Sequence, residues 1–325
     1  MDNKVNISSI TMVEKHKNKK IKKYINILSI LIGIMLTIFL AVQIFTMSKF
    51  INIHVEYEDV YTAEDFEITS EKLKLKTADG LNIIAHEVFV SEPKAVVILI
   101  SGIHNPSITA FFGHSKMLQE NGYASILLEL RAHGESEGNV IGLGYKEHLD
   151  AKAVVEYIKS NNKYKNVPIV IHGASMGGAT AINSFGQIPE IDGLISMSAF
   201  SSWEDVFCDT MINMRVPKAF AYMQKPFMKL HTTLKYGFES IDISPKIQIR
   251  NAGERPVLIM HSSEDPEVPF SNFERIMKNA PEHAESWVRE GYHHFIVERD
   301  SLLNPQNDKE YSERVLQFLN NHFGN

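Results

Sequence analysis

The sequence predicts an α/β protein with a doubly wound, mostly parallel sheet, preceded by one transmembrane helix. Short apolar runs without polar alternation recur along the chain, which is typical of strands buried on both faces of a parallel sheet. Segments with helical periodicity alternate with these runs. A single long apolar segment, residues 24–48, precedes them all and contains no charged residue.

Composition limits the classes of function. Of the 325 residues, 44% are hydrophobic and 22% are charged, close to the globular average. The formal net charge of −6 argues against a nucleic-acid partner, because phosphate contacts need a basic surface. The single cysteine, Cys208, excludes an intramolecular disulfide and is expected to be a buried apolar residue rather than a nucleophile.

The N-terminal region predicts a membrane anchor. Residues 1–23 contain seven lysines against two acidic residues, and the chain beyond Lys49 is mostly acidic. The apolar segment 24–48 exceeds the roughly 20 residues that a spanning helix needs. The positive-inside rule then places the basic tail in the cytoplasm and the rest of this single-pass membrane protein outside it.

A cleaved signal peptide and a lipoprotein anchor are the two alternatives to a transmembrane anchor. A cleaved signal peptide has an apolar region of about 7–15 residues and a small-residue cleavage site, and neither feature fits here. A lipoprotein anchor would need a cysteine just beyond the apolar run, and the sequence has none there. We therefore expect residues 24–48 to be an uncleaved signal anchor.

The part after the anchor is expected to be a linker, residues 49–70, and one domain, residues 71–325. The domain opens with a predicted β-hairpin, in which Asp79 and Gly80 form the turn between alternating segments. Apolar runs predict five buried strands, and one-face periodicity predicts two helices. The strands are 95–100, 125–128, 167–171, 194–197 and 257–260, and the helices are 151–158 and 311–319.

Residues 202–250 interrupt this alternation. They contain no clear strand and are rich in phenylalanine and methionine, with Pro217 and Pro226 among them. We interpret them as a small helical cap insertion over one edge of the sheet. Methionine adapts to irregular apolar shapes, so the cap is a candidate lining for an acyl chain, with simple helix packing as the alternative.

The segment Gly173-Ala-Ser175-Met-Gly177 predicts a nucleophile elbow. It follows the buried strand 167–171 and precedes the helix-like stretch 179–185. This strand–turn–helix context supports the G-x-S-x-G pattern, which alone is weak. Glycines two residues before and after the serine leave room for a tight turn that exposes the serine oxygen.

A serine nucleophile needs a base and an acid, which follow it in the order acid then histidine. Asp265 follows the buried strand 257–260 and is the predicted acid, with Glu264 as rival and Glu267 as a third choice. After a predicted helix, 272–280, and a predicted strand, 285–290, comes His294, the predicted base. The neighbouring His293 is its rival, and Gly291, three residues before His294, favours His294.

These motifs resemble the α/β-hydrolase superfamily over residues 71–323, in the branch with lysophospholipases, monoacylglycerol lipases and serine aminopeptidases. The resemblance rests on the elbow, on Asp265 followed by Val268-Pro269, and on the stretch Gly291–His294. Residues 129–136 are similar to the D-x-R-G-H-G-x-S loop of this family. Here Glu129 replaces the aspartate and Ala132 replaces the first glycine.

The resemblance implies an α/β-hydrolase fold and an oxyanion hole made by the backbone N–H groups of Met176 and Ile103. Ser101 departs from the His-Gly pair that relatives usually carry before this second donor. We expect a membrane-anchored serine hydrolase that cleaves a carboxylic ester, esterase- or lipase-like, through Ser175, His294 and Asp265 and an acyl-enzyme. A serine peptidase, thioesterase or amidase is the alternative on the same site, and a non-catalytic binding module is the alternative of another class.

The predicted partners are a small-molecule or lipid-like acyl substrate and the membrane. No metal or organic cofactor is expected, because acyl transfer by this set of residues needs neither. No group of histidines, cysteines and carboxylates in the sequence has metal-ligand spacing.

Overall fold

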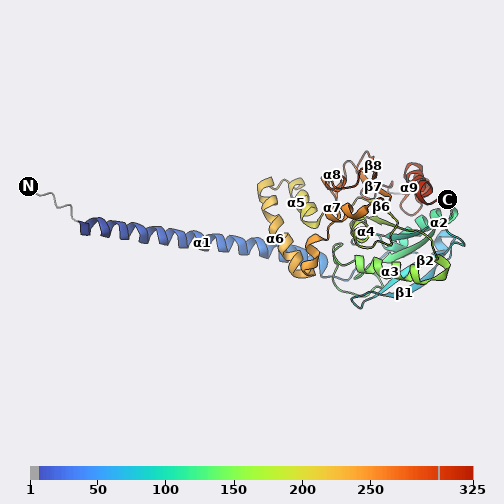
Figure 1. Ribbon diagram of the computed structural model, residues 1–325, viewed down its shortest axis with the longest axis horizontal. Helices are drawn as coiled ribbons and strands as arrows, with labels where there is room; N and C mark the ends of the chain where they lie inside the picture. The colour runs from blue at the N-terminus through green and yellow to red at the C-terminus, as the bar shows by residue number, and fades with distance from the viewer. Residues whose placement is uncertain (1–6, 299–300, 325) are drawn as a thin grey trace, which may run out of the picture. The chain divides into compact units, whose positions relative to one another are not determined.

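The computed structural model describes residues 7–298 and 301–324 (Figure 1). The chain divides into two compact units, residues 1–47 and residues 48–325, each of which is described by itself. In the first unit, most described side chains of helix α1 (Ile7–Ile51) are exposed. The segment Glu14–Ile51 is long and apolar enough to cross a membrane, by the criteria of length and composition that a signal sequence also meets.

The second unit is built on a twisted sheet with the strand order β1-β2-β4-β3-β5-β6-β7-β8. Strands β1 and β2 pair antiparallel, as do β2 and β4, and the remaining pairs are parallel. The strands are β1 (Glu71–Lys76), β2 (Asn82–Val88), β3 (Val96–Ile100), β4 (Ala124–Glu129), β5 (Ile169–Ala174), β6 (Gly193–Met197), β7 (Val257–Ser262) and β8 (Glu285–Arg289). The predicted mostly parallel sheet with an antiparallel edge is confirmed.

Helices lie on both faces of the sheet, which explains the continuous apolar runs (Figure 1). Val97 and Leu99 of β3 belong to the main core together with side chains of α2 and α9, whereas Ile98, between them, points to the opposite face and is also fully buried. Helices α3 and α4 pack on each other, and α4 contacts β5 and β6. The helices are α2 (Phe112–Glu120), α3 (His148–Ser160), α4 (Met176–Gln187), α8 (Ser271–Met277) and α9 (Lys309–Phe323).

Short 3-10 helices complete the connections. They are η1 (Glu64–Phe66), η2 (Ile108–Phe111), η3 (Asn162–Tyr164), η4 (Phe238–Asp242), η5 (Ile249–Ala252) and η7 (Pro305–Asn307). The predicted hairpin is present, because Lys76 pairs with Asn82 and the turn contains Gly80 at a φ of 94°. Glycine takes this left-handed conformation without steric cost.

Helices α5 (Trp203–Asn213), α6 (Lys218–Tyr236) and α7 (Pro245–Gln248) occupy the interval between β6 and β7. Asp205 of α5 joins all three, because its carboxylate accepts hydrogen bonds of 2.6 Å from both Lys225 and Lys246. Burial opposes ionisation of Asp205, but these lysines outweigh it and lower its pKa. Cys208 is buried in α5, and burial raises the pKa of its thiol to about 11, so the thiol is unsuited to nucleophilic attack.

The segment between α1 and the sheet contacts the loop after β4. Val55 forms a parallel bridge with His133, in which the Val55 N–H donates to Ala132 and the Val55 carbonyl accepts from Gly134, both at 2.8 Å. Both ring nitrogens of His54 lie within 2.8 Å of backbone carbonyls of the same loop. Part of the predicted linker is therefore ordered against the domain.

Candidate active site

Ser175 stands at the sharp turn between β5 and α4. Its φ and ψ are 56° and −120°, a conformation that costs a non-glycine residue on the order of 1–3 kcal/mol. A Cβ atom on Gly173 would lie 2.0 Å from the carbonyl oxygen of Gly177, and one on Gly177 would lie 2.3 Å from that of Ser101. Both glycines of the motif are therefore required by backbone contacts.

The structure brings the three residues predicted to form the triad together from three separate loops. The Ser175 hydroxyl lies 2.8 Å from Nε2 of His294, and Nδ1 of His294 lies 2.9 Å from Oδ2 of Asp265. Asp265 also accepts hydrogen bonds of 2.9 Å from the backbone N–H groups of Glu267 and Val268. These two backbone bonds hold the carboxylate of Asp265 in its position next to Nδ1 of His294.

The residues that the sequence offered as alternatives to His294 and Asp265 do not take their places in this series. The backbone carbonyl of His293 accepts a hydrogen bond from Ser262, and its ring stacks on Tyr292 at a centroid distance of 5.5 Å. Glu264 is exposed. Glu267 approaches the other side of the imidazole, with Oε2 3.6 Å from Nε2 of His294, and so is not placed behind the base.

The two backbone groups expected to form an oxyanion hole belong to segments that pack against each other. Met176 is the first residue of α4, so its N–H has no acceptor within the helix. The close approach of Gly177 to Ser101 places this helix end against the loop after β3 that contains Ile103. Ser101, which departs from the family pattern, holds its own loop, because its hydroxyl donates to the carbonyl of Pro106 at 2.7 Å.

The loop after β4 accommodates both departures from the family motif. The carboxylate of Glu129 accepts hydrogen bonds from the N–H groups of Glu135 (2.7 Å) and Ser136 (3.0 Å). Ala132 adopts a φ of 60°, the conformation for which glycine is usual. His133 then reaches the loop after β3, with Nε2 2.5 Å from the carbonyl oxygen of Ile103.

His261 is a neighbour of the site that the sequence did not indicate. Its ring lies 3.7 Å from Oδ2 of Asp265, and its Nε2 is 2.9 Å from the carbonyl oxygen of Val268. Burial lowers the pKa of His261, which favours the neutral ring. A neutral His261 donates its Nε2 proton to Val268 and so supports the turn around Asp265. This histidine lies in β7, one residue beyond the predicted strand 257–260, and no sequence motif includes it.

A hollow of about 610 Å³ lies beside the imidazole of His294. Its described lining is Pro266, Glu267, Tyr292, His293, His294, Phe295, Val297 and Leu302. None of these residues comes from the cap. Three of the large apolar residues of α6, Met223, Leu230 and Leu234, are 46%, 46% and 67% exposed instead. The described hollow therefore gives no support to the expected acyl-chain lining by the cap.

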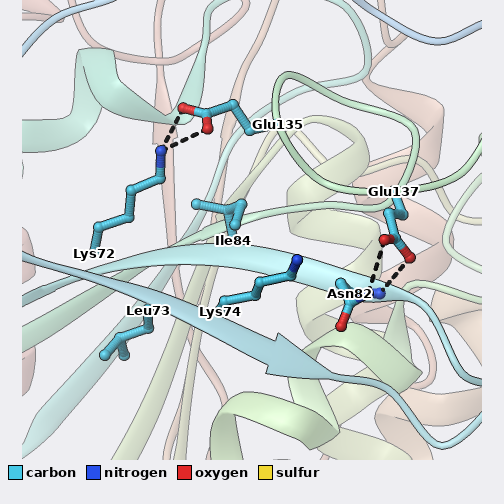
Figure 2. A pocket seen from close by; sticks show the side chains of 7 residues that line it. All are labelled: Lys72, Leu73, Lys74, Asn82, Ile84, Glu135 and Glu137. Carbon is cyan, nitrogen blue, oxygen red and sulfur yellow. Dashed lines mark hydrogen bonds and ion pairs between the residues drawn. The ribbon is translucent and has the colours of Figure 1, made fainter.

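A second hollow, of about 390 Å³, lies at the β1–β2 edge (Figure 2). Four of its five charged or polar side chains are paired with each other. Lys72 pairs with Glu135 at 2.6 Å, and the side-chain amide of Asn82 donates to Glu137 at 2.7 Å. None of the residues predicted to be catalytic lines this hollow, so the arrangement around Ser175 remains the candidate active site.

Known proteins resemble this chain in sequence. Residues 91–216 match the family described as serine aminopeptidase, S33. An uncharacterized protein of Bacillus subtilis, YqkD, is 23% identical over 250 residues, which cover 76% of this chain and 78% of that protein. The protein bem46 of Schizosaccharomyces pombe is 24% identical over 219 residues, 65% of this chain and 66% of that protein.

Solved structures share the fold. An esterase of Pyrococcus furiosus, Pf2001, superposes with a TM-score of 0.63 at 23% identity, covering 85% of this chain and 98% of that chain. The acylaminoacyl peptidase of Pyrococcus horikoshii gives a TM-score of 0.58 at 16% identity, over 79% of this chain and 42% of that chain. These superpositions show that the chain has an α/β-hydrolase fold. The family match over residues 91–216 supports hydrolase activity.

Proposed function

We propose that the chain is a membrane-anchored serine hydrolase that cleaves a carboxylic ester. The hydrogen-bonded series Ser175–His294–Asp265 supports this proposal, because a serine hydroxyl gains nucleophilicity only when a base can take its proton. The proposal also rests on the esterases among the structural neighbours.

In the proposed reaction, Ser175 Oγ attacks the carbonyl carbon while Nε2 of His294 takes the hydroxyl proton. Asp265 stabilises the imidazolium that forms and keeps the proton on Nδ1. The N–H groups of Met176 and Ile103 bind the oxyanion, and each such donor contributes roughly 2.7–4 kcal/mol in acyl transfer. His294 then protonates the leaving alcohol, and a water molecule, activated by the same ring, releases the acid from the acyl-enzyme.

The test is hydrolysis of chromogenic esters of increasing acyl length by the full chain in a neutral detergent. We expect Ser175→Ala and His294→Ala each to lower kcat by about a millionfold, and Asp265→Ala by about 10,000-fold. The matched control is His293→Ala, which removes a neighbouring imidazole outside the series and should retain most of the activity. Activity that survives Ser175→Ala but disappears with His293→Ala would contradict the assignment.

A peptidase is the second candidate, because the matched family is described as serine aminopeptidase. The same residues would cleave an amide, with His294 protonating the leaving amine. Aminoacyl anilides in the same assay separate the two activities. If no substrate is cleaved and a phosphonate fails to label Ser175, the chain acts as a binding module.

The membrane-anchor proposal rests on the apolar helix segment Glu14–Ile51 and on the lysines before residue 24. These lysines favour a cytoplasmic N-terminus. A catalytic domain outside the cytoplasm is expected to be degraded when protease is added to intact cells, whereas a tag before residue 24 should be protected. A mature N-terminus beyond residue 40, found by mass spectrometry, would show cleavage and remove the anchor.

A further inference from the structure

The hollow beside His294 has the chemistry of a cation site. Glu267 is the one carboxylate among its described lining residues, and neither lysine nor arginine occurs among them. The Glu267 side chain is 68% exposed and belongs to the loop that Asp265 stabilises. Two aromatic rings, Tyr292 and Phe295, line the same hollow. A carboxylate and aromatic rings around one hollow favour an ammonium group, because ring faces attract cations.

The position of the hollow tells which part of a substrate it would receive. In acyl transfer the histidine passes its Nε2 proton to the leaving atom, so the leaving group lies next to Nε2. Glu267 reaches within 3.6 Å of this nitrogen, and the ring of His294 forms part of the wall. The hollow therefore extends from the place where the leaving group departs.

We propose that this hollow selects esters whose alcohol part bears an ammonium group, with Glu267 as the ion partner and Tyr292 and Phe295 as the aromatic contacts. The proposal rests on the proposed serine hydrolase function and specifies its substrate class. Tyr292 is 71% exposed and stacks on His293, which is the second histidine of the wall besides His294. Phe295 also lies against the loop after β3, where one of its ring carbons is 3.5 Å from a Cβ built on Gly102.

The test compares two esters of equal shape, butyrylcholine and 3,3-dimethylbutyl butyrate, which differ in a positively charged nitrogen against a neutral carbon. For the full chain in neutral detergent, kcat/KM should be about tenfold higher for the choline ester, mainly through a lower KM. Glu267→Gln keeps the shape of the side chain and should lower the ratio of the two kcat/KM values several-fold, with the remainder due to the aromatic contacts. The matched control is Glu264→Gln, an exposed neighbour outside the hollow, which should leave the ratio unchanged.

The ratio of the two kcat/KM values is compared because Glu267 also lies close to His294. Loss of its charge therefore changes kcat/KM for both esters, and this common change cancels in the ratio. Equal kcat/KM for the two esters in the unmodified chain, or a ratio that Glu267→Gln leaves unchanged, would overturn the proposal.

Matched methylphosphonates with the same two alcohols separate this proposal from the proposed function. Labelling forms the bond from Ser175 Oγ to phosphorus and breaks the bond from phosphorus to the alcohol oxygen, which takes the serine proton through His294. Labelling is measured by the intact mass of the protein. Faster labelling by the choline phosphonate supports the proposed selection of an ammonium group even where ester turnover is slow. Equal labelling rates overturn the proposed selection of an ammonium group, but leave the proposed serine hydrolase function standing. Absence of labelling and of turnover with both pairs overturns the serine hydrolase function and this proposal with it.

Discussion

Asp265 contacts Nδ1 of His294 through both carboxylate oxygens, at 3.0 and 2.9 Å, and its side chain is completely excluded from solvent. A carboxylate can only accept at this position, so the Nδ1 atom must carry a proton. Nε2 is then left as the acceptor for the hydroxyl of Ser175, 2.8 Å away. One buried contact therefore sets the tautomer that the proposed chemistry needs.

Replacing Asp265 by asparagine tests this relationship. The shape is retained, but the amide N–H₂ group can donate to Nδ1 and favours the opposite tautomer. We expect kcat for a neutral ester to fall by about 10,000-fold while KM changes little. The thermal unfolding midpoint provides the control for folding. A variant that retains more than a tenth of the activity would contradict the role assigned to Asp265.

Gly177→Ala should destabilise the domain through the elbow. The added Cβ would lie 2.3 Å from the carbonyl oxygen of Ser101 and 2.5 Å from that of Ile100, and backbone atoms of a packed strand cannot move away cheaply. We expect the free energy of unfolding to fall by about 3 kcal/mol. Gly253→Ala is the control, because its Cβ meets nothing within 4 Å and only the backbone conformation, with φ of 60° and ψ of −134°, costs energy, about 1–2 kcal/mol. Equal losses for both variants would show that the close approach does not matter.

The buried pair Arg131–Asp150 should behave as a unit. Nε and Nη2 of Arg131 lie 2.9 and 2.7 Å from Oδ1 of Asp150, and the side chains are 6% and 0% exposed. Asp150→Ala leaves a buried guanidinium with only Asp79 as partner, and we expect a loss of about 3–5 kcal/mol of unfolding free energy. The double variant Arg131→Met, Asp150→Leu should lose less than the single one. A double variant that is the less stable of the two would contradict this prediction.

His54 should make stability depend on pH. Its Nδ1 and Nε2 lie 2.8 and 2.7 Å from the carbonyl oxygens of Gly138 and Gly134, and only the imidazolium can donate to both. These two contacts raise its pKa, partial burial opposes the rise, and Glu56 and Glu129 add to it. The stabilisation is thus complete below the unfolded pKa of about 6.5 and is lost as pH rises through the higher folded pKa.

The measurement is the difference in unfolding midpoint between the native chain and His54→Gln from pH 5.5 to pH 9. We expect the difference to be largest at the acidic end and to shrink as pH rises. His283→Gln replaces an exposed histidine whose ring contacts a single carbonyl, that of Arg255, and serves as the control. A difference that grows with pH would contradict the sign of the effect.

Much of the fold could be predicted because the signals are local. The apolar runs indicate strands that are buried on both faces of a sheet, and the Asp79-Gly80 pair indicates the turn of a hairpin. The two glycines around Ser175 report a turn in which a Cβ would meet backbone atoms at 2.0 and 2.3 Å. Each of these properties depends on residues close together in the chain, so the sequence by itself determined the sheet, its antiparallel edge and the position of the serine at its turn.

The tertiary structure decided the choices between neighbours. His293 and His294 are adjacent and chemically identical, and only the path of the loop after β8 turns one ring toward Ser175 and the other toward Tyr292. Glu267 seemed a remote rival to Asp265, yet the same turn places its carboxylate on the opposite side of the imidazole. The physical reason is that a side chain's direction in a loop depends on contacts between segments far apart in the chain, and sequence spacing does not record them.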